Sequence, residues 1–309
     1  MHTLRALSAL LLAPLLLAAS LLVGLSADAA GLKIAATTSD LAAIAAAVGG
    51  EHAEVTALSL HTQDPHWVDA RPNLALTLSR ADLLVLAGLD LEVGWLPNLL
   101  TGARNAAIQP GAAGYFDASA FVHLLQVPTG QVDRSQGDVH PGGNPHYTYD
   151  PRSALLIAPA LADRMAQLDP DNAVAYAANA AAFTGELAEA VGRWEGTLAH
   201  LQGAPVIQFH RSWTYLEDWV GFELVGEIEP KPGVPPTPAH VARTVGLARS
   251  KGVKLVLKEF YFPDTTAALV AEKAGASLLT LPGGTDFVGG QTYIERMDVV
   301  VGLLAREGT

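Results

Sequence analysis

Two histidines that each follow a proline are the first residues in this sequence whose types and setting suggest chemistry. His66 and His146 both stand in loops rich in proline, where the preceding ring fixes the backbone. A third, His210, follows an apolar run, and Asp286 lies among glycines after another such run. Neutral imidazole and carboxylate suit Zn²⁺, and three histidines with one aspartate complete a tetrahedron. The pattern therefore suggests that these segments converge on one cation.

The other polar residues near these segments leave alternatives open. Glu259 ends an apolar run and competes with Asp286 as the carboxylate, or it holds a ligand histidine by its other ring nitrogen. Asp286 by itself also fits a turn residue or a helix cap. His140 lies in the Gly- and Pro-rich loop before His146, and we expect it to serve only capture or transfer of the ion. Four other histidines are expected to be surface or internally satisfied residues: His52, His123, His200 and His240. His61 is close to His66 in the sequence but falls in a flexible, polar stretch.

Composition excludes several classes of protein. The 309 residues carry a net charge of −12 without any basic run, which argues against nucleic acid as a partner. There is no cysteine, so disulfides, thiolate metal sites, cysteine nucleophiles and a lipid-modified N-terminal cysteine are all excluded. The common hydrolase and nucleotide-binding motifs are also absent from the sequence. Any metal site must therefore be built from His, Asp or Glu.

The N-terminal segment has the pattern of a secretory signal. Arg5 precedes an apolar run over 6–25, and Ala27-Asp28-Ala29 has the form of a cleavage site. We expect residues 1–30 to be a signal peptide that is removed near Ala30 or Gly31. The apolar run is also long enough to span a bilayer, so a membrane anchor is the alternative.

Strands and helices alternate along the rest of the chain, which predicts an α/β protein with parallel sheets. The first half, 31–168, is expected to form one lobe with strands at 32–38, 53–60, 81–88 and 106–109. The second half, 204–309, repeats this order with strands at 205–210, 222–228, 253–260 and 277–281. The similar order of a strand, a proline-rich loop, a helix and a strand in both halves looks like a diverged duplication.

A long helix is predicted between the two lobes. After a helix over 151–168, Asp169 and Pro170 open an Ala-rich run without further proline to about Leu201. At 1.5 Å per residue this run is about 45 Å long. We interpret 169–203 as a rigid linker that limits how far the two lobes can move apart.

The predicted strands place the candidate ligands together. In open parallel sheets, ligands bind at the carboxyl ends of the strands. His66, His210 and Asp286 each follow a predicted strand, so they share that location. This placement predicts one shared metal site.

Several short motifs together resemble one known family. They are Asp64-Pro-His66, Asn144-Pro-His146, Phe209-His210 and Thr285-Asp286 with 293–297 downstream. Their order and spacing are similar to those of the zinc/manganese-type periplasmic solute-binding proteins of bacterial ABC transporters, the metal-binding cluster A-I family.

The resemblance implies two α/β lobes joined by one long helix, with metal in the cleft. By position it implies His66, His146, His210 and Asp286 as ligands. A histidine at the third position resembles the zinc-type members. The resemblance further implies a monomeric periplasmic protein that delivers zinc to a membrane permease, with a metallochaperone as an additional partner in some systems.

Two other functions remain to be weighed against zinc delivery. The first is a secreted hydrolase with a three-histidine zinc and Glu259 as general base, in which water would occupy the fourth position. The second is a manganese-specific binding protein or an adhesin on the same fold, because fold alone does not determine function. Ligation by Asp286 would fill the fourth position and argue against hydrolysis.

Overall fold

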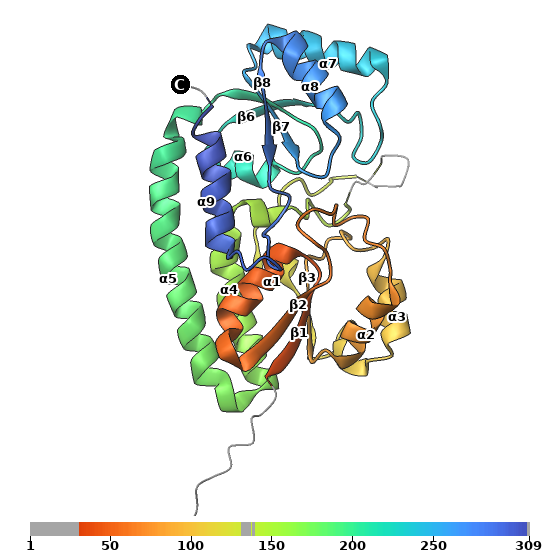
Figure 1. Ribbon diagram of the computed structural model, residues 1–309, viewed down its shortest axis with the longest axis vertical. Helices are drawn as coiled ribbons and strands as arrows, with labels where there is room; N and C mark the ends of the chain where they lie inside the picture. The colour runs from red at the N-terminus through yellow and green to blue at the C-terminus, as the bar shows by residue number, and fades with distance from the viewer. Residues whose placement is uncertain (1–30, 131–136, 138–139, 308–309) are drawn as a thin grey trace, which may run out of the picture. The chain divides into compact units, whose positions relative to one another are not determined.

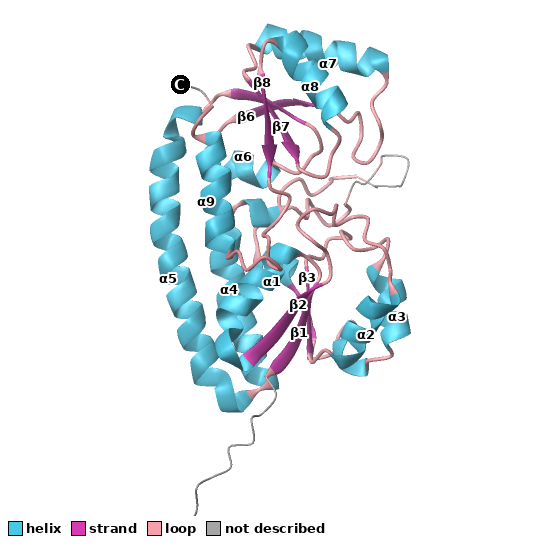
Figure 2. Ribbon diagram, viewed as in Figure 1, coloured by secondary structure: helices cyan, strands magenta, loops and turns pink. Residues whose placement is uncertain are grey.

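Two parallel four-stranded sheets form the frame of the protein (Figure 1, Figure 2). The computed structural model describes residues 31–130, 137 and 140–307. The predicted signal segment, 1–30, lies outside the described residues. Both sheets lead through loops at the carboxyl ends of their strands toward the region between them (Figure 2). The α/β class predicted from the sequence is confirmed.

The first sheet has the strand order β2-β1-β3-β4, and all its pairs are parallel. Its strands are β1 (Leu32–Ala36), β2 (Ala53–Ala57), β3 (Leu83–Leu86) and β4 (Tyr115–Asp117). Its helices are α1 (Ser39–Gly49), α2 (Pro72–Arg80) and α3 (Leu96–Ala103). All four residues of β3 are buried, which explains why this strand reads as an unbroken apolar run.

One predicted strand in this half is wrong. Residues 106–108 form a 3-10 turn, and the fourth strand lies further along at Tyr115–Asp117. Asn105 caps the turn by accepting from the Ala107 backbone, and its amide donates to the carbonyls of Leu78 and Ala81. The side chain of Asn105 thus competes with strand pairing. The actual strand is only three residues long and has too few positions to show a pattern.

The second sheet repeats the topology of the first, with the order β6-β5-β7-β8. Its strands are β5 (Pro205–Gln208), β6 (Glu223–Glu227), β7 (Leu255–Glu259) and β8 (Ser277–Leu281). Its helices are α6 (Thr214–Val220), α7 (Pro238–Lys251) and α8 (Asp264–Ala274). All pairs are parallel. The shared strand order agrees with the internal repeat read from the sequence.

Three helices run beside the two sheets. They are α4 (Pro151–Leu168), α5 (Ala173–Leu198) and α9 (Tyr293–Leu304), and Figure 1 shows α5 alongside both of the others. Short 3-10 turns at Pro170–Asn172 and Ala199–Leu201 extend α5 at its two ends. The buried side of α5 follows the helical period through large side chains such as Tyr176, Phe183 and Trp194. The predicted long helix is therefore confirmed.

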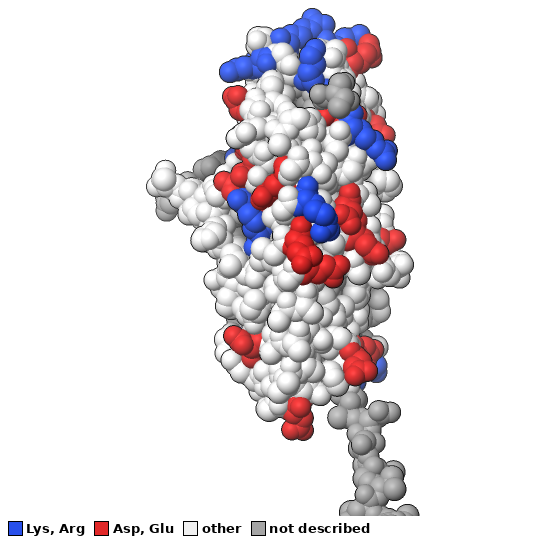
Figure 3. All heavy atoms as spheres, turned by 90° about the vertical axis from the view of Figure 1, so that its left-hand side faces the viewer, with Lys and Arg blue, Asp and Glu red and all other residues white. Residues whose placement is uncertain are grey.

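The outer face of α5 carries little charge. Figure 3 shows a largely uncharged face, on which basic side chains gather at the top and acidic side chains gather near the middle beside a few basic ones. None of the described helices combines the length and the apolar character needed to cross a membrane.

A buried aspartate joins the elements on the two sides of the site. Asp40, at the start of α1, accepts hydrogen bonds from the backbone N–H of Thr285 at 2.8 Å and from its hydroxyl at 2.7 Å. Thr285 lies in the loop after β8, and both residues are buried. Tyr293 adds a bond from its hydroxyl to the Thr148 carbonyl at 2.8 Å. The bonds to Asp40 hold the loop after β8 against α1, and the Tyr293 bond ties α9 to the turn before α4.

Replacing Asp40 by Ala should therefore destabilise the metal-free protein by about 1–3 kcal/mol, because two buried donors lose their acceptor. Urea unfolding followed by circular dichroism measures this difference. Glu189→Ala is the matched control, since Glu189 is an exposed acid on α5. Equal unfolding midpoints for the two variants would contradict the role given to Asp40.

Candidate metal centre

Three of the four expected ligands converge between the two sheets. His66 lies in the loop after β2, His146 in the loop before α4, and His210 directly after β5. One ligand atom from each residue lies within 4.8 Å of the others. The three rings are buried, with only 8%, 6% and 4% of each residue exposed. This spacing and burial are those of a site that can hold one small cation.

Each of these rings is oriented by a hydrogen bond at Nδ1. A carboxylate or amide oxygen is the acceptor in each case, which leaves Nε2 free to face the shared space. The pairs are His66 with Asp64 at 2.7 Å, His146 with Asn144 at 2.9 Å, and His210 with Glu229 at 2.7 Å. The Nε2 atom of His146 is buried without a hydrogen-bond partner, as expected for a nitrogen that awaits a metal ion.

Two of the orienting residues share a sequence pattern whose role our sequence reasoning did not assign. In Asp64-Pro-His66 and Asn144-Pro-His146, an Asx residue stands two positions before the histidine. Its side-chain oxygen accepts from the backbone N–H of the histidine at 2.9 Å in both cases, and also from the ring. The Asx-Pro-His pattern could therefore have identified both orienting residues. Glu229 gave no such local signal, because it lies 19 residues from His210.

The surroundings keep the histidines suited to binding a cation. Burial, with the charges of neighbouring rings, lowers the pKa of His146 well below its ordinary value. Burial alone would raise the pKa of Asp64, but its hydrogen bond with His66 outweighs this and the pKa is lowered. His146 is thus neutral, and Asp64 is an ionised acceptor, at neutral pH.

His140 lies closer to the centre than the sequence suggested. Its Nε2 is 3.3 Å from Nε2 of His66, and its ring centroid is 6.4 Å from that of His146. Burial, and next the charge of His66, lower the pKa of His140 to about 4, while a hydrogen bond with the Leu89 backbone acts in the opposite direction. The structure thus places His140 beside the three-histidine group.

Asp286 lies outside that group. Its Oδ1 is 3.2 Å from Nδ1 of His61 and accepts from the Gly289 backbone at 3.0 Å. The Asp286 backbone N–H donates to the side chain of Gln291 at 2.9 Å. The side chain is 47% exposed. His61 therefore contacts the carboxylate that the sequence predicts as the fourth ligand.

Glu259 ends β7 in full burial, with the Ser212 hydroxyl beside its carboxyl group. No hydrogen bond joins it to a histidine within the described residues. Burial raises the pKa of Glu259 to about 8, and the nearby charges of Asp64 and Glu229 add to the effect. Asp64, Asn144 and Glu229, and not Glu259, therefore orient the ligand histidines.

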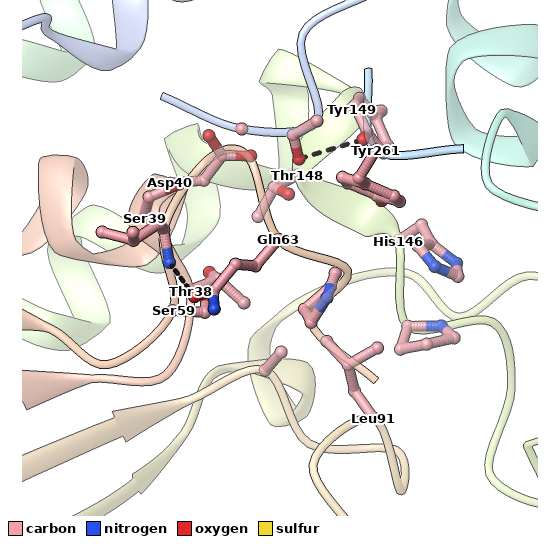
Figure 4. A pocket seen from close by; sticks show the side chains of 16 residues that line it. Thr38, Ser39, Asp40, Ser59, Gln63, Leu91, His146, Thr148, Tyr149 and Tyr261 are labelled. Carbon is pink, nitrogen blue, oxygen red and sulfur yellow. Dashed lines mark hydrogen bonds between the residues drawn. The ribbon is translucent and has the colours of Figure 1, made fainter. Parts of the chain in front are cut away.

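Two small cavities flank the histidines. One has a volume of about 30 Å³ and extends from His146 toward Asp40, Gln63 and Tyr261 (Figure 4). The other, of about 40 Å³, is bounded by the rings of His140, His146 and His210. Such volumes hold a water molecule or an ion. A typical organic ligand needs hundreds of cubic ångströms, so the spaces beside these rings favour an ion as ligand.

The buried carboxyl of Glu259 makes the stability of the metal-free protein depend on pH. Because its folded-state pKa of about 8 exceeds the unfolded value of 4.5, the folded state holds the extra proton between these values. Stability contributed by the neutral carboxyl is therefore lost as pH rises from about 4.5 to 8.

Glu259→Gln removes this ionisation. Near pH 4.5, urea unfolding should give the variant and the parent similar free energies of unfolding. Near pH 9, the variant should be more stable than the parent by a few kcal/mol. Glu223→Gln, at an exposed position of β6, is the control. A stability difference between Glu259→Gln and parent that stays constant with pH would refute the assigned ionisation.

Comparison with known sequences identifies the family of this chain. A family model for ZnuA, described as the zinc-uptake complex component A, periplasmic, matches residues 34–306. The manganese-binding lipoprotein MntA of Halalkalibacterium halodurans is 25% identical over 282 residues, covering 89% of this chain and 87% of that protein. The manganese transporter lipoprotein PsaA of Streptococcus pneumoniae is 29% identical over 161 residues, but this match spans only 48% of its length.

Solved structures show the same fold. A crystal structure of ZnuA superposes with a TM-score of 0.74 at 24% identity, covering 90% of this chain and all of that one. The solute-binding protein FpvC of Pseudomonas aeruginosa, in complex with Mn²⁺, gives a TM-score of 0.75 at 23% identity and covers 89% of this chain and 97% of that one. At these identities the likeness concerns the fold. Because the family model matches most of the chain, the protein belongs to the ZnuA family of periplasmic metal-binding components, the substrate-binding proteins of ABC transporters.

Proposed function

We propose that this protein captures Zn²⁺ outside the cytoplasm and delivers it to the membrane permease of an ABC transporter. The observation that carries the proposal is the convergence of three buried imidazoles, each held at Nδ1 by a protein acceptor. Three Nε2 lone pairs then face one small space. A divalent cation is the ligand that satisfies all three at once.

The choice of zinc rests on the type of donor atom. Three imidazoles make a nitrogen-rich site, which suits four-coordinate Zn²⁺, whereas Mn²⁺ prefers more oxygen ligands. The general order of affinities also places Zn²⁺ above Mn²⁺ at such a site. Manganese is the competing candidate, because the relatives MntA and PsaA are named for it. Metal competition decides between the two.

The hydrolase alternative has less support. The cavities beside the histidines hold an ion or a water molecule, and they leave little room for a substrate with a scissile bond. Glu259, the candidate general base, has no hydrogen bond to the described histidines and lies fully buried. Membership of a family of solute-binding proteins argues in the same direction.

Asp286 is the carboxylate that the sequence nominates for the fourth position of the site. It would become a ligand only in a rearranged state. To reach the ion it would have to leave His61 and the Gly289 backbone. The loop after β8 that carries Asp286 is also tied to Asp40 through Thr285.

The cellular setting follows from the same proposal. Residues 1–30 would direct export and then be removed, so that the mature protein works in the periplasm as a monomer. Its partners would be the permease and, where one exists, a periplasmic metallochaperone. Intact-mass measurement of exported protein distinguishes a cleaved form that starts near Ala30 or Gly31 from an anchored one.

The central site is tested by removing one ligand. Calorimetry should show one tight Zn²⁺ per chain in the parent and tighter binding of Zn²⁺ than of Mn²⁺. His210→Ala should lower the zinc affinity at least ~100-fold, because it removes both a nitrogen ligand and the hydrogen bond with Glu229 that orients this ligand. His123→Ala, at an exposed position, is the matched control. Parent-like zinc binding by the His210 variant, or tighter Mn²⁺ than Zn²⁺ binding in the parent, would overturn the proposal.

The orienting acceptors are tested separately. Glu229→Gln keeps the shape of the side chain but removes the charge that fixes the His210 ring, and it should lower zinc affinity ~10–100-fold. Glu223→Gln on the neighbouring strand should leave the affinity unchanged. Titration with zinc against a competing chelator measures both. Equal affinities would mean that the His210–Glu229 contact has no part in holding the ion.

A further inference from the structure

We propose that His140 is the fourth ligand of the ion in the arrangement described here. This inference rests on the proposed function, because it concerns the same centre. It differs from the expectation that the sequence raised, in which Asp286 fills the fourth position and His140 serves only capture. Three observations carry it: a distance, the directions of the ring nitrogens, and the turn that holds His140.

The distance matches the geometry of tetrahedral zinc. With Zn–N bonds of about 2.0–2.1 Å, two nitrogens of a tetrahedron lie about 3.3–3.4 Å apart. The two Nε2 atoms of His140 and His66 are 3.3 Å apart. His140, His146 and His210 together bound the cavity of about 40 Å³. His140 thus borders the same small space as His146 and His210 while its Nε2 faces that of His66.

The orientation of the rings argues against the simplest alternative, a hydrogen bond between the two rings. The Nδ1 of His66 donates to a carboxylate, so its Nε2 carries a lone pair when the ring is neutral. The His140 ring hydrogen-bonds to the Leu89 backbone, and we assign that bond to Nδ1 because Nε2 faces His66. Two neutral rings oriented in this way have no proton to share. Their lone pairs repel each other unless a cation lies between them.

An unusual turn holds the Leu89 carbonyl in place. Gly88, Leu89 and Asp90 all have positive φ, at 73°, 53° and 64°. For the two residues other than glycine, such a backbone costs of order 1 kcal/mol or more each. Gly142 packs directly against this turn, because a Cβ added there would lie 2.8 Å from Leu89 Cδ2. Strain of this kind persists where the surrounding structure requires it, and here it orients a histidine.

The loop that carries His140 is also fixed at its far end. The His140 carbonyl accepts from the Gly143 backbone at 3.2 Å, and the Asn144 backbone N–H donates to Leu125 at 2.9 Å. Asn144 is the residue that orients His146. A single short turn therefore positions His140 together with the acceptor of a neighbouring ligand. Asp286, by contrast, is engaged elsewhere.

The test compares His140→Ala with Asp286→Ala in the full mature chain, using Zn²⁺ alone as the probe. We expect His140→Ala to lower zinc affinity at least ~10-fold, and Asp286→Ala to change it less than ~3-fold. X-ray absorption of the zinc-loaded parent should show four nitrogen ligands with imidazole scattering. The His140 variant should show three nitrogens and an oxygen, with an unchanged unfolding midpoint without metal.

His140→Asp supplies a second check, because a carboxylate at this position should recover part of the affinity that alanine loses. The proposal is overturned if His140→Ala keeps both the parent affinity and four nitrogens, or if Asp286→Ala causes the larger loss. Failure of zinc binding in the parent itself would instead refute the proposed function. The two failures are therefore distinguishable.

Discussion

The metal centre depends on one repeated interaction, the hydrogen bond from Nδ1 of a buried histidine to a fixed protein acceptor. Asp64, Asn144 and Glu229 each fix one ring. Fixing Nδ1 as a donor leaves Nε2 as a lone pair, and the three lone pairs converge in a region from which water is largely excluded. Without a cation these lone pairs repel one another. The protein thus keeps an unfavourable arrangement that binding of a metal ion relieves.

The fold supplies the framework that makes this possible. Both sheets are parallel and have the same strand order, so each presents its loops at the carboxyl ends of its strands. His66 comes from the first sheet, and His210 comes from the second. The long helix α5 runs beside both parts, and the bonds between Asp40 and Thr285 connect them close to the site. A centre assembled from separate loops is therefore supported by rigid elements on both sides.

Buried carboxyl groups near the centre have different electrostatic roles. Asp64 is kept ionised by its bond with His66, whereas Glu259 is kept largely protonated by burial and by the charges of Asp64 and Glu229. Glu259 makes no hydrogen bond to a histidine among the described residues, and other acceptors orient the three ligand rings.

The sequence by itself determined the class of fold, the long helix and the three central histidines. Alternating apolar runs, proline-punctuated loops and the Ala-rich stretch after Pro170 are local patterns, and local patterns specify strands and helices. The sequence could not decide the fourth position or the orienting partner of His210. These depend on contacts between residues far apart in the chain, such as His66 with His140 or His210 with Glu229. Only the folded backbone, with its strained turn at Leu89, brings those groups within bonding distance.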